Sequence, residues 1–420
     1  MASIKTRKKN KRVVITGIGI ISPNGIGKER FWQANLKGTS GIDYIDNFDT
    51  EPNATKIGGI VKDFSPNQYL KSDTMRRLDR FSQFALAAAS MAIEDARISL
   101  KTINKDNTGT YVGSGIGGIL FHEEQITQIL QNKIIRPDPL AIVKIMPNSP
   151  SSNISIEFGI KGPALTISTA CSSGLQAVGE AFNLIRWGNM ETMIAGGTEA
   201  PLTYFTFSAF NSLRVMTQRN DPPDEASCPF DKRRDGFVLA EGAGFVILET
   251  LEMALARNAD IYAEITGFSS NSSSYHIVSP QPDGADVAKA IWLALKDADI
   301  KNKDIDYINA HGTSTCLNDA IETMAIKRVF QEHAYKLLVS STKSMIGHPI
   351  AAAGPIGLIA AALAMKNNIA PPTINYKESD PSCDLNYVPN IALSKKIKTA
   401  MVNSFGFGGS NAVMIIKKFS

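Results

Sequence analysis

The sequence predicts an α/β protein built from two similar halves, and three observations support this prediction. Short β-branched runs alternate with amphipathic helical patterns along the chain, which is typical of α/β folds. The helical segment AIEDARI (residues 92–98) has a close copy in ALKDADI (residues 294–300), and a strand containing tyrosine follows each copy. A strand ending in Thr-Gly precedes each copy. We therefore expect two halves of related topology, at residues 13–255 and 256–420, after a basic flexible tail at residues 1–12.

The strands and helices follow in order from the periodicity of apolar residues. Strands are expected where β-branched runs are bounded by glycine or polar residues: Val13–Thr16, Thr110–Gly113, Ala164–Ser168, Thr192–Ala195, Phe245–Leu248, Tyr262–Thr266, Tyr307–Ala310, Leu337–Ser340, Ala400–Asn403 and Ala412–Ile416. Helices are expected where apolar residues recur every three or four positions, at about 79–97, 172–187, 284–299, 317–331 and 350–366. In the second of these helices one face carries Leu175, Val178, Phe182 and Ile185.

The composition indicates an ordinary globular chain with a nearly neutral body. Of 420 residues 43% are apolar and 20% charged, which excludes disordered, collagen-like and disulfide-rich secreted proteins. There are 44 basic and 40 acidic residues, but residues 1–12 hold six of the basic ones and no acid. A nucleic-acid binder would spread a basic face over its fold. We therefore expect no nucleic-acid partner, and a tail that is either solvated or an electrostatic docking arm.

Other features of the chain point to a cytoplasmic protein. No apolar segment of a secretory signal follows the basic tail. The apolar stretch at residues 349–365 is too short and too rich in alanine and glycine for a membrane span, so we expect a buried helix and no membrane partner. The four cysteines form no C-x-x-C pair, which argues against a zinc site and against a disulfide framework.

The most informative segment is LTISTACSSG, residues 165–174. An apolar strand ends, a turn of small residues follows, and a helix is expected to begin at or just after Cys171. A thiolate at a helix N-terminus is favoured by the helix dipole, and the free N–H groups there can stabilise an oxyanion. Cys171 is therefore a candidate nucleophile, with a buried inert cysteine as the alternative. We expect Cys228, Cys316 and Cys383 to be structural.

Two of the five histidines occupy similar settings. His311 lies in NAHGTST (residues 309–315) at the end of a strand, where α/β proteins place functional groups. His348 lies in STKSMIGH (residues 341–348), at the start of the alanine-rich helix. By the repeat, that helix corresponds to the one that begins at Cys171, and a pseudo-twofold axis would bring the two helix N-termini together. A cysteine nucleophile usually acts with histidine.

Glycine-rich turns supply two further signals. NSFGFGGSN (residues 403–411) lies between the last two strands and can provide a second oxyanion N–H group, although a simple hairpin is the alternative. Gly113-x-Gly115-x-x-Gly118 matches a dinucleotide-binding pattern, but no acid follows at the usual distance. We therefore expect no nicotinamide cofactor.

Together these segments resemble the elongating β-ketoacyl-acyl-carrier-protein synthases of the Cys-His-His type, in the thiolase superfamily. The resemblance runs from VVITGIG at residue 13 to GFGGSNA at residue 406, and its specific motifs are TACSSG, NAHGTST, STKSMIGH and NSFGFGGSN in this order. It implies a thiolase-like fold of two duplicated βαβαβαββ halves in a five-layer α-β-α-β-α arrangement. It also implies that no metal or cofactor is needed, because decarboxylation itself supplies the carbanion equivalent.

The resemblance implies a role for each matching residue. Cys171 would take the acyl chain, while His311 and His348 would bind the malonyl carbonyl and promote decarboxylation. The N–H groups of Cys171 and Phe407 would form the oxyanion hole. The remaining implied roles are a supporting charged pair of Lys343 and Glu322, substrate binding near the malonyl end by Thr313 and Thr315, substrate binding by Phe405 and Phe407, and gating of the acyl pocket by Phe407.

The pathway is less well defined than the reaction. TCLND (residues 315–319) departs from the usual fatty-acid pattern and, with CPFD and AEGAG, looks more like the ketosynthase subunit of a type II polyketide synthase. Phe405-Gly406-Phe407 looks more like ketoacyl synthase II of fatty-acid synthesis. We lean to the polyketide subunit, whose partners would be an acyl carrier protein and a homologous chain-length factor; the fatty-acid enzyme would be a homodimer. A non-catalytic partner resembling a chain-length factor is a third reading, which Cys171 disfavours.

Overall fold

The main sheet of the computed structural model, which describes residues 10–419, repeats one strand order twice. Its strands run β11-β10-β14-β15-β9-β1-β8-β7-β5-β6, with β2 beside β1. Read outward from the centre, β1-β8-β7-β5-β6 and β9-β15-β14-β10-β11 have the same order in the chain. The two parts join where Val13–Ile15 pairs antiparallel with Ala263–Ile265.

The bounds of the strands in this sheet are β1 Val13–Ser22, β2 Gly25–Ile26, β5 Thr108–Gly113, β6 Ala164–Ile167, β7 Thr192–Glu199, β8 Gly242–Thr250, β9 Ala263–Ser272, β10 Tyr307–Asn309, β11 Leu338–Ser340, β14 Thr399–Gly406 and β15 Ser410–Lys417. Two small ribbons pair β3 (Ile42–Tyr44) with β4 (Ile57–Gly59), and β12 (Ile369–Ala370) with β13 (Leu393–Ser394).

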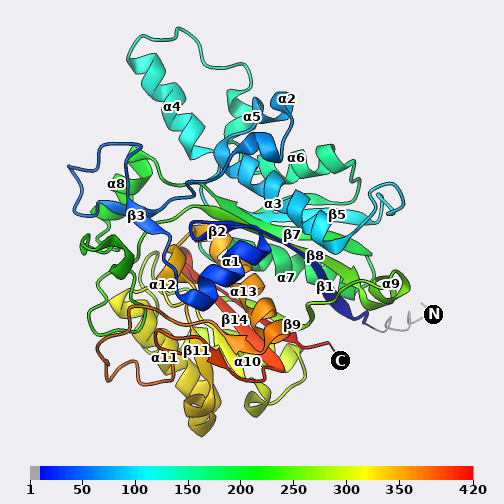
Figure 1. Cartoon of the computed structure of the whole chain (residues 1–420), viewed down its shortest axis with the longest axis vertical. Coiled ribbons are helices and arrows are strands. Elements are labelled where there is room, and N and C mark those ends of the chain that lie inside the picture. Colours follow the sequence, from blue (N-terminus) through cyan, green and yellow to red (C-terminus); the bar gives the residue numbers. More distant parts are fainter. Residues whose placement is uncertain (1–9, 420) are drawn as a thin grey trace.

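Helices cover both faces of each part of the sheet, which gives five layers (Figure 1). α3 and α6 pack on one outer face, α7 and α13 lie between the two parts, and α10 and α11 pack on the other outer face. Each half is therefore βαβαβαββ, as predicted. The helices are α1 Lys28–Lys37, α2 Ser72–Met75, α3 Arg80–Ala96, α4 Ile119–Leu130, α5 Ala141–Ile145, α6 Ser149–Phe158, α7 Ser173–Arg186, α8 Tyr204–Ser212, α9 Leu251–Ala256, α10 Ala285–Asp297, α11 Cys316–Phe330, α12 Lys343–Ile346 and α13 Ala353–Asn367.

The alternation of side chains along the strands explains the layers. In β14, Ala400 and Val402 belong to the central core, whereas Met401 between them belongs to the outer core against α10 and α11. Successive residues of a strand point to opposite faces of a sheet, and both faces here are buried. The strands therefore read as continuous apolar runs, which is why they were predictable.

All ten predicted strands and all five predicted helices are present, but some bounds differ. β1 continues past the predicted end at Thr16 to Ser22, because Gly17 and Gly19 allow α3 to pack directly against the strand. A Cβ atom on Gly19 would lie 1.8 Å from the carbonyl oxygen of Ala88. The last predicted helix begins as a 3-10 turn, Ile350–Ala352, and becomes α-helical at Ala353.

The sequence repeat corresponds to repeated contacts between strand and helix. A Cβ atom on Gly17 of β1 would lie 2.2 Å from the carbonyl oxygen of Ala92 in α3. A Cβ atom on Gly267 of β9 would lie 2.7 Å from the carbonyl oxygen of Ala294 in α10. Both glycines lie where a helix of the repeat, α3 or α10, crosses its strand, so both helices approach the sheet closely for the same reason.

The repeated aspartates also make equivalent hydrogen bonds. Asp95 accepts from the N–H of Ile18 at 2.9 Å, and Asp297 accepts from the N–H of Phe268 at 2.9 Å. Each aspartate thus binds the residue just after the contact glycine. The cationic partners differ, because Asp95 pairs with Lys28 and Asp297 pairs with Arg186.

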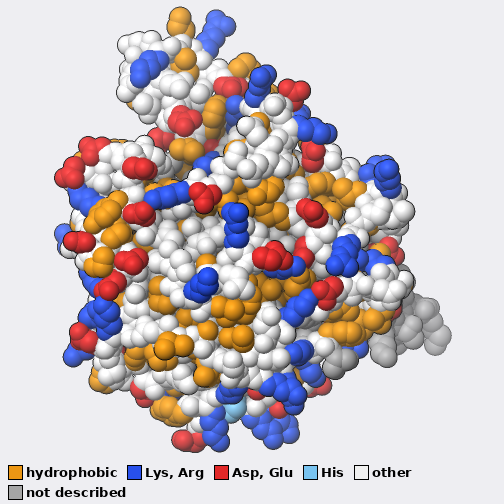
Figure 2. Space-filling model, in the orientation of Figure 1, with side chains coloured by type: hydrophobic (Ala, Val, Ile, Leu, Met, Phe, Trp, Pro, Cys, Tyr) orange, Lys and Arg blue, Asp and Glu red, His pale blue; other side chains and the backbone are white. Residues whose placement is uncertain are grey.

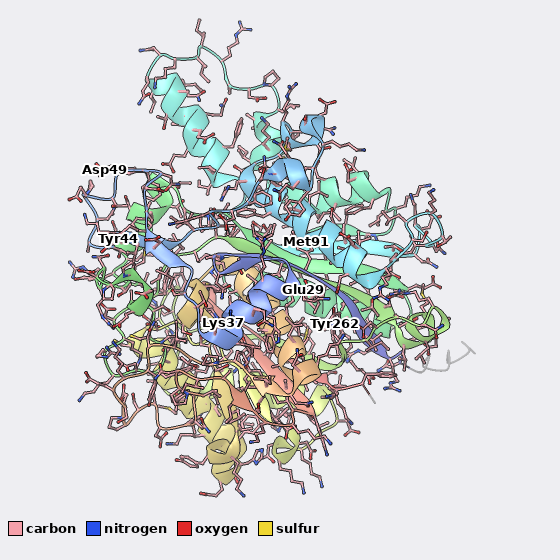
Figure 3. All side chains as sticks on the ribbon, viewed as in Figure 1. Glu29, Lys37, Tyr44, Asp49, Met91 and Tyr262 are labelled. Carbon is pink, nitrogen blue, oxygen red and sulfur yellow. The ribbon has the colours of Figure 1, made fainter. Side chains whose placement is uncertain are left out.

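The network around Asp95 links the two halves. Tyr262, which directly precedes β9 and is labelled in Figure 3, donates its hydroxyl proton to Asp95 at 2.8 Å. Lys28 of α1 donates to Tyr262 Oη at 2.7 Å and to Asp95 at 2.5 Å. This cluster lies where β1 and β9 pair and supports the junction with three polar side chains.

α7 and α13 approach each other at their N-termini. A Cβ atom on Gly174 would lie 2.2 Å from the carbonyl oxygen of Ala351, and one on Gly354 would lie 2.7 Å from the Cβ atom of Leu175. Within the described residues, one helical stretch, Ile350–Asn367, is apolar and long enough to cross a membrane, but 89% of it is buried inside the fold. The expectation of a buried helix at this position is confirmed.

The predicted tail at residues 1–12 lies mostly outside the described residues, but its last part belongs to the fold. Lys11 donates its N–H to the carbonyl oxygen of Arg186 at 2.8 Å. Arg12 binds Glu264 of β9 through two nitrogens. The prediction of a flexible tail is therefore wrong for these two residues. Strand β1 is paired in the sheet from its first residue, Val13, and this pairing fixes the residues just before it. Figure 2 shows basic and acidic side chains interspersed over the visible face.

Candidate active site

A cavity of about 500 Å³ lies at the ends of the strands, between the two halves. The predicted site residues that line it are Cys171, His311, Thr313, Thr315, Glu322, His348, Phe405 and Phe407. Lys343 lies behind the wall, with its ammonium group on the carbonyl oxygen of His311 at 2.5 Å. Residues separated by more than 200 positions in the chain thus surround one space.

Cys171 lies in a strained turn between β6 and α7. Ala170, just before it, has a φ of +51°, a left-handed conformation that costs free energy for a residue with a side chain. Hydrogen bonds hold the turn: Ser173 Oγ donates to the carbonyl oxygen of Ala170 at 2.5 Å and accepts from the N–H of Thr169 at 2.8 Å. Ser404 of β14 donates to the carbonyl oxygen of Cys171 at 2.9 Å. The thiol is thereby fixed at the N-terminal end of α7.

The surroundings of the thiol combine burial with polar groups. The Cys171 side chain is buried, and this burial raises the pKa of its thiol to about 11. Three contributions oppose the rise in pKa: the positive charge of Lys343, the backbone N–H of Phe407 and the backbone N–H of Cys171 itself. The thiol is therefore protonated in the empty site, in contrast to the thiolate that the helix position suggested. The two N–H groups nevertheless point at the sulfur.

Glu322 and Lys343 hold the backbone of His311 from two sides. Glu322 accepts the N–H of His311 at 2.9 Å and the N–H of Gly312 at 2.8 Å. Lys343 donates to the carbonyl oxygen of His311. The expected charged pair is not a direct ion pair, since among residues 10–419 no salt bridge within 4.0 Å joins the two. They act through the peptide groups between them, and burial raises the pKa of Glu322 and lowers that of Lys343 to about 8.

His348 is placed by the loop that follows β11 and α12. Its N–H donates to the carbonyl oxygen of Val238 at 2.7 Å, and its own carbonyl oxygen accepts from the N–H of Ala240 at 3.1 Å. Its ring is nearly perpendicular to the ring of Phe237, with centroids 5.4 Å apart. Gly347, with a φ of +71°, allows the chain to turn into this position.

The two imidazole rings lie side by side and are both neutral. Their centroids are 5.5 Å apart and their planes are nearly perpendicular. Burial and the charge of Lys343 lower the pKa of both histidines well below the ordinary value. The Nδ1 atom of each ring is buried without a hydrogen-bond partner. A neutral imidazole has one N–H donor, so the Nε2–H tautomer would direct that donor away from the partnerless nitrogen and into the cavity.

The loop between β10 and α11 presents the two threonines. Their hydroxyl groups, Thr313 Oγ1 and Thr315 Oγ1, lie 2.9 Å apart. Thr315 is also the N-cap of α11 and accepts from the N–H of Asn318. Asp319, which is fully buried, accepts from the N–H groups of Thr313 and Ser314. This aspartate gives the loop its shape.

The turn between β14 and β15 brings two phenylalanines to the cavity. The Phe405 ring lies 5.5 Å from the His311 ring, edge to face. Gly406 packs against the cysteine turn, and a Cβ atom there would lie 2.6 Å from the carbonyl oxygen of Thr169. Gly408 and Gly409 both have a φ of +79°, which only glycine adopts readily. The glycines therefore allow the N–H of Phe407 to reach the sulfur.

Sequence reasoning missed two buried charged residues near the cavity. Glu199, at the end of β7, binds the loop Ser114–Ile116 in the cavity wall. Arg234 donates to Asp380 and to the carbonyl oxygens of Thr315 and Cys316. A buried charge inside a strand-end sequence such as AGGTEA (residues 195–200) is the signal that could have identified Glu199.

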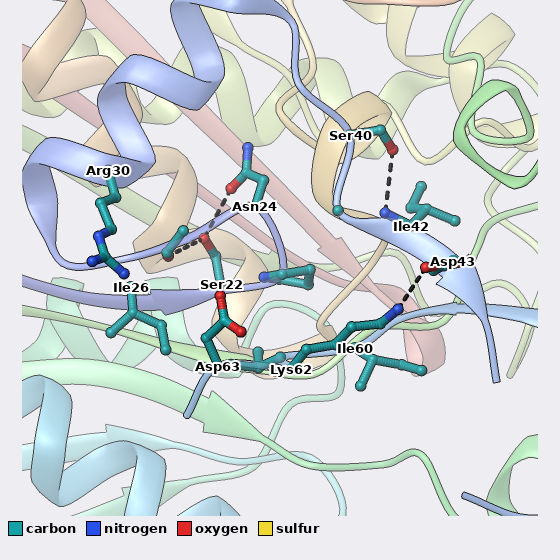
Figure 4. Close-up of a pocket in the computed structure, with 14 residues that line it drawn as sticks. Ser22, Asn24, Ile26, Arg30, Ser40, Ile42, Asp43, Ile60, Lys62 and Asp63 are labelled. Atoms are coloured by element: carbon teal, nitrogen blue, oxygen red, sulfur yellow. Dashed lines mark hydrogen bonds and ion pairs between the residues drawn. The ribbon is translucent and has the colours of Figure 1, made fainter. Parts of the chain in front are cut away.

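A second hollow, of about 350 Å³, lies away from these residues. Residues 22–26, 30, 40–43 and 60–63 line it, and in Figure 4 Lys62 of its wall forms an ion pair with Asp43. None of the predicted site residues belongs to it. Among residues 10–419, no group of three or more His, Cys, Asp and Glu side chains is arranged to hold a metal ion.

Comparisons with known proteins match most of the chain to one family. The N-terminal domain model of β-ketoacyl synthases matches residues 10–254, and the C-terminal domain model matches residues 262–377. The 3-oxoacyl-[acyl-carrier-protein] synthase 2 of Synechocystis is 44% identical over 98% of this chain and 99% of its own length. The enzymes of the same name from Staphylococcus aureus and Coxiella burnetii are 43% identical with the same coverage.

Solved structures extend the likeness to the whole fold. A type II polyketide ketosynthase, solved in complex with its acyl-carrier protein, has a TM-score of 0.91 and 36% identity over 98% of this chain and 100% of its own. The ishigamide ketosynthase/chain length factor has a TM-score of 0.92 and 34% identity with the same coverage. The fold is thus thiolase-like, as predicted, and the chain is an acyl-transferring condensing enzyme. It belongs to the β-ketoacyl synthase family.

Proposed function

We propose that this protein catalyses the decarboxylative condensation of an acyl group, carried on Cys171, with malonyl-acyl carrier protein, in the elongation of fatty acids. One observation carries the proposal. A buried thiol that receives two backbone N–H groups shares a single cavity with two neutral imidazoles whose Nδ1 atoms have no partner. An acyl-transfer nucleophile, an oxyanion site and two hydrogen-bond donors are the groups that this reaction requires.

The first half-reaction transfers the acyl chain. The sulfur of Cys171 attacks the acyl thioester, its bond to the carbonyl carbon forms, and the carrier thiolate leaves and takes up the proton lost by the cysteine. The N–H groups of Cys171 and Phe407 stabilise the tetrahedral oxyanion. The thiol has a pKa of about 11 in the empty site, so forming the thiolate costs free energy. The positive charge of Lys343 lowers that cost.

The second half-reaction uses the histidines. His311 and His348 donate to the thioester carbonyl of the malonyl group while its carboxylate leaves as carbon dioxide. The electron pair of the broken bond becomes an enolate, which attacks the acyl carbonyl on Cys171. The new carbon–carbon bond forms, and the cysteine is expelled as a thiolate and protonated again. Neutral imidazoles suit this step, because they donate hydrogen bonds without neutralising the malonyl carboxylate.

The other predicted residues surround these two steps. Thr313 and Thr315 provide adjacent hydroxyl groups on the polar side of the cavity, where the malonyl carboxylate would lie. Phe405 packs against the ring of His311, and Phe407 contributes its N–H and a ring at the cavity wall. Lys343 and Glu322 keep the His311 peptide in place.

The comparisons support the fatty-acid pathway better than the polyketide pathway to which the sequence motifs leaned. The relatives named 3-oxoacyl-[acyl-carrier-protein] synthase 2 are 43–44% identical to this chain, whereas the polyketide ketosynthases are 34–36% identical. Part of that lean rested on Asn318 and Asp319 in TCLND. Asp319 binds the backbone of Thr313, Ser314 and Phe230, so it serves the shape of the loop and is a poor indicator of the pathway.

The acyl carrier protein is the expected partner, and a second chain is expected at the sheet edge. β6 ends the sheet with one side unpaired, and Leu165 on it is 50% exposed. An open apolar edge strand invites pairing with another chain. For the fatty-acid reading this chain is a second copy. The polyketide reading stays as the second candidate, with a homologous chain-length factor at the same edge.

The experiment uses the purified full-length chain with acyl- and malonyl-acyl carrier protein. We expect 3-oxoacyl-carrier product from the chain alone, a dimer by light scattering, and an acyl group on Cys171 by peptide mass mapping. Product formed only after addition of a homologous partner would favour the polyketide reading. Labelling by a cysteine-directed ketosynthase inhibitor at a cysteine other than Cys171 would contradict the enzyme reading and favour a non-catalytic partner.

A further inference from the structure

One buried carboxylate lies beside the proposed reaction centre without a role in the mechanism. Glu199 has no exposed surface. It accepts hydrogen bonds from the N–H of Gly115 at 2.7 Å, from the N–H of Ile116 at 3.1 Å and from Ser114 Oγ at 3.1 Å. The N–H of Ala351, in the turn that follows His348, opposes the rise in the pKa of this carboxyl group. A single side chain thus holds the loop after β5 through three hydrogen bonds.

The loop held by Glu199 is equivalent to the loop that carries His311. The repeat aligns Tyr111 of β5 with Tyr307 of β10. In this alignment Gly115 corresponds to His311, and Ile116 corresponds to Gly312. In both halves, two successive N–H groups at the end of the strand donate to one buried carboxylate: Glu199 in the first half and Glu322 in the second.

The two carboxylates come from different elements. Glu199 ends β7, whereas Glu322 lies on α11. The equivalence is therefore not a remnant of the duplication, because the duplicated positions do not coincide. Both halves instead meet the same requirement: N–H groups at a strand end, buried beside a cavity, need an acceptor that does not move.

The walls that the two carboxylates support differ in character. Glu322 holds the polar wall, which contains His311 and the threonines. Glu199 holds an apolar wall, where Gly115 and Ile116 adjoin Ile350. A Cβ atom on Gly115 would lie 3.2 Å from Cγ2 of Ile350, and Ile350 packs in the same apolar cluster as Cys171.

We propose that Glu199 is a positioning residue for the acyl chain, which fixes the apolar wall beside Cys171 as Glu322 fixes the polar wall at His311. The inference rests on the proposed function and assigns one carboxylate to each half-reaction. An acyl tail would pack against the wall at Gly115 and Ile116, and the wall can hold a tail in one place only if its own N–H groups are fixed. A buried side chain that accepts three hydrogen bonds from this loop provides that fixation.

The charge of Glu199 is part of this arrangement. Burial raises its pKa to about 7, and the hydrogen bonds from Gly115, Ile116, Ser114 and Ala351 oppose that rise. Glutamine in its place has nearly the same shape. However, its amide nitrogen would face N–H donors, so about half of the hydrogen bonds would be lost without a cavity being created.

The test measures the two half-reactions separately in the full-length enzyme. Acyl transfer is followed as acyl-Cys171 formation by intact mass, with a short and a long saturated acyl-carrier substrate. Decarboxylation is followed as carbon dioxide release from malonyl-acyl carrier protein by enzyme already loaded with a short acyl group. The variants are Glu199→Gln and its matched control Glu322→Gln.

We expect Glu199→Gln to slow transfer of the long chain on the order of tenfold, the effect of one or two lost hydrogen bonds. Transfer of the short chain and decarboxylation should change less than about twofold on the same scale. Glu322→Gln should show the opposite pattern, with slower decarboxylation and nearly normal acyl transfer. Ser114→Ala removes only one of the hydrogen bonds to Glu199 and provides a milder variant if Glu199→Gln does not fold.

Equal losses in both half-reactions, or equal losses for short and long chains, would overturn the proposal and leave Glu199 a general structural residue. Normal kinetics of both Glu199→Gln and Ser114→Ala would do the same. Failure of the wild-type chain to form any acyl-Cys171 would instead contradict the proposed function. The two failures are therefore distinguishable in one set of measurements.

Discussion

At the ends of β5 and β10 the chain presents the same pair of N–H donors with different side chains. Two N–H groups donate to a buried carboxylate in each case, but the first loop carries Gly115 at the position where the second carries His311. The pair of N–H donors, and not the side chain, is what the two loops share. The fold thus supplies an equivalent carboxylate support for each of the two loops. Only the second loop carries a side chain proposed to act in the reaction, which is His311.

The frame behind the two loops is equally alike. Gly17 allows α3 to pack against β1, and Gly267 allows α10 to pack against β9. Asp95 and Asp297 each accept a hydrogen bond from the residue that follows the glycine. These residues lie in the layers outside the central helices, whereas Cys171 and the histidines lie between the halves. Substitutions in the frame should therefore change stability, and substitutions at the cavity should change activity.

The largest expected effect tests that separation at the cavity. Cys171→Ala removes the group proposed to carry the acyl chain, so condensation should fall by about a thousandfold or more, as for other nucleophiles that form covalent intermediates. The midpoint of thermal unfolding should change little, because alanine fills most of the space of a small buried thiol. Product formation and calorimetry measure the two effects, and a large loss of stability would show that the site and the frame are not separate.

The next effect tests the frame in both halves. Gly17→Ala should lower the free energy of unfolding by about 3 kcal/mol, the upper part of the range for overpacked sites. Its Cβ atom would lie 2.2 Å from a backbone oxygen that cannot move away easily. Gly267→Ala should cost less, because the corresponding distance is 2.7 Å. Urea unfolding measures the two losses in free energy of unfolding. A larger loss for Gly267→Ala than for Gly17→Ala would contradict the interpretation of the two contacts as equivalent.

A third effect concerns the positive charge of Lys343, which acts on both Cys171 and His311. The cation of Lys343 lowers the pKa of the Cys171 thiol, which burial raises to about 11. Lys343 is itself protonated only below its pKa of about 8. Lys343→Met should therefore slow iodoacetamide alkylation of Cys171 about tenfold at pH 7, corresponding to about one pKa unit. The difference from wild type should shrink as the pH rises above 8.

Peptide mass mapping follows this alkylation, and the exposed Cys316 is the internal control. Its rate should be the same in both proteins, because Cys316 is exposed and the Lys343 ammonium group contacts the carbonyl oxygen of His311 instead. Equal rates for Cys171 in wild type and Lys343→Met at pH 7 would show that the ammonium group serves only the backbone of His311.

The smallest effect separates the role of Thr315 as a helix cap from its role in substrate binding. Thr315→Ala removes the N-cap of α11 and should lower the free energy of unfolding by about 1 kcal/mol, the usual cost of a lost cap. Thr315→Ser keeps the cap and should restore stability. If the serine variant regains stability but not the KM for malonyl-acyl carrier protein, the methyl group of Thr315 contributes to substrate binding.

Much of the fold was predictable because most strands are buried on both faces. β8 and β15 read as continuous apolar runs, and their positions followed from the sequence. The short ribbons β3–β4 and β12–β13 contain only two or three residues per strand, which leaves no periodicity to detect. β1 was predicted too short, because Gly17 and Gly19 resemble strand breakers when the helix that needs their small size is not known.

The residues of the proposed reaction centre could be identified from the amino-acid sequence: Cys171 in a strand–turn–helix, and two histidines in glycine- and serine-rich turns that a repeat relates. How the charges act depends on the tertiary structure. The resemblance implied a pair of Lys343 and Glu322, but the two bind opposite sides of one peptide; Glu199 was not noticed at all. The physical reason is that a hydrogen bond between residues far apart in the chain, such as that of Gly115 to Glu199, depends on which buried N–H groups lack a partner. Sequence spacing carries no record of that.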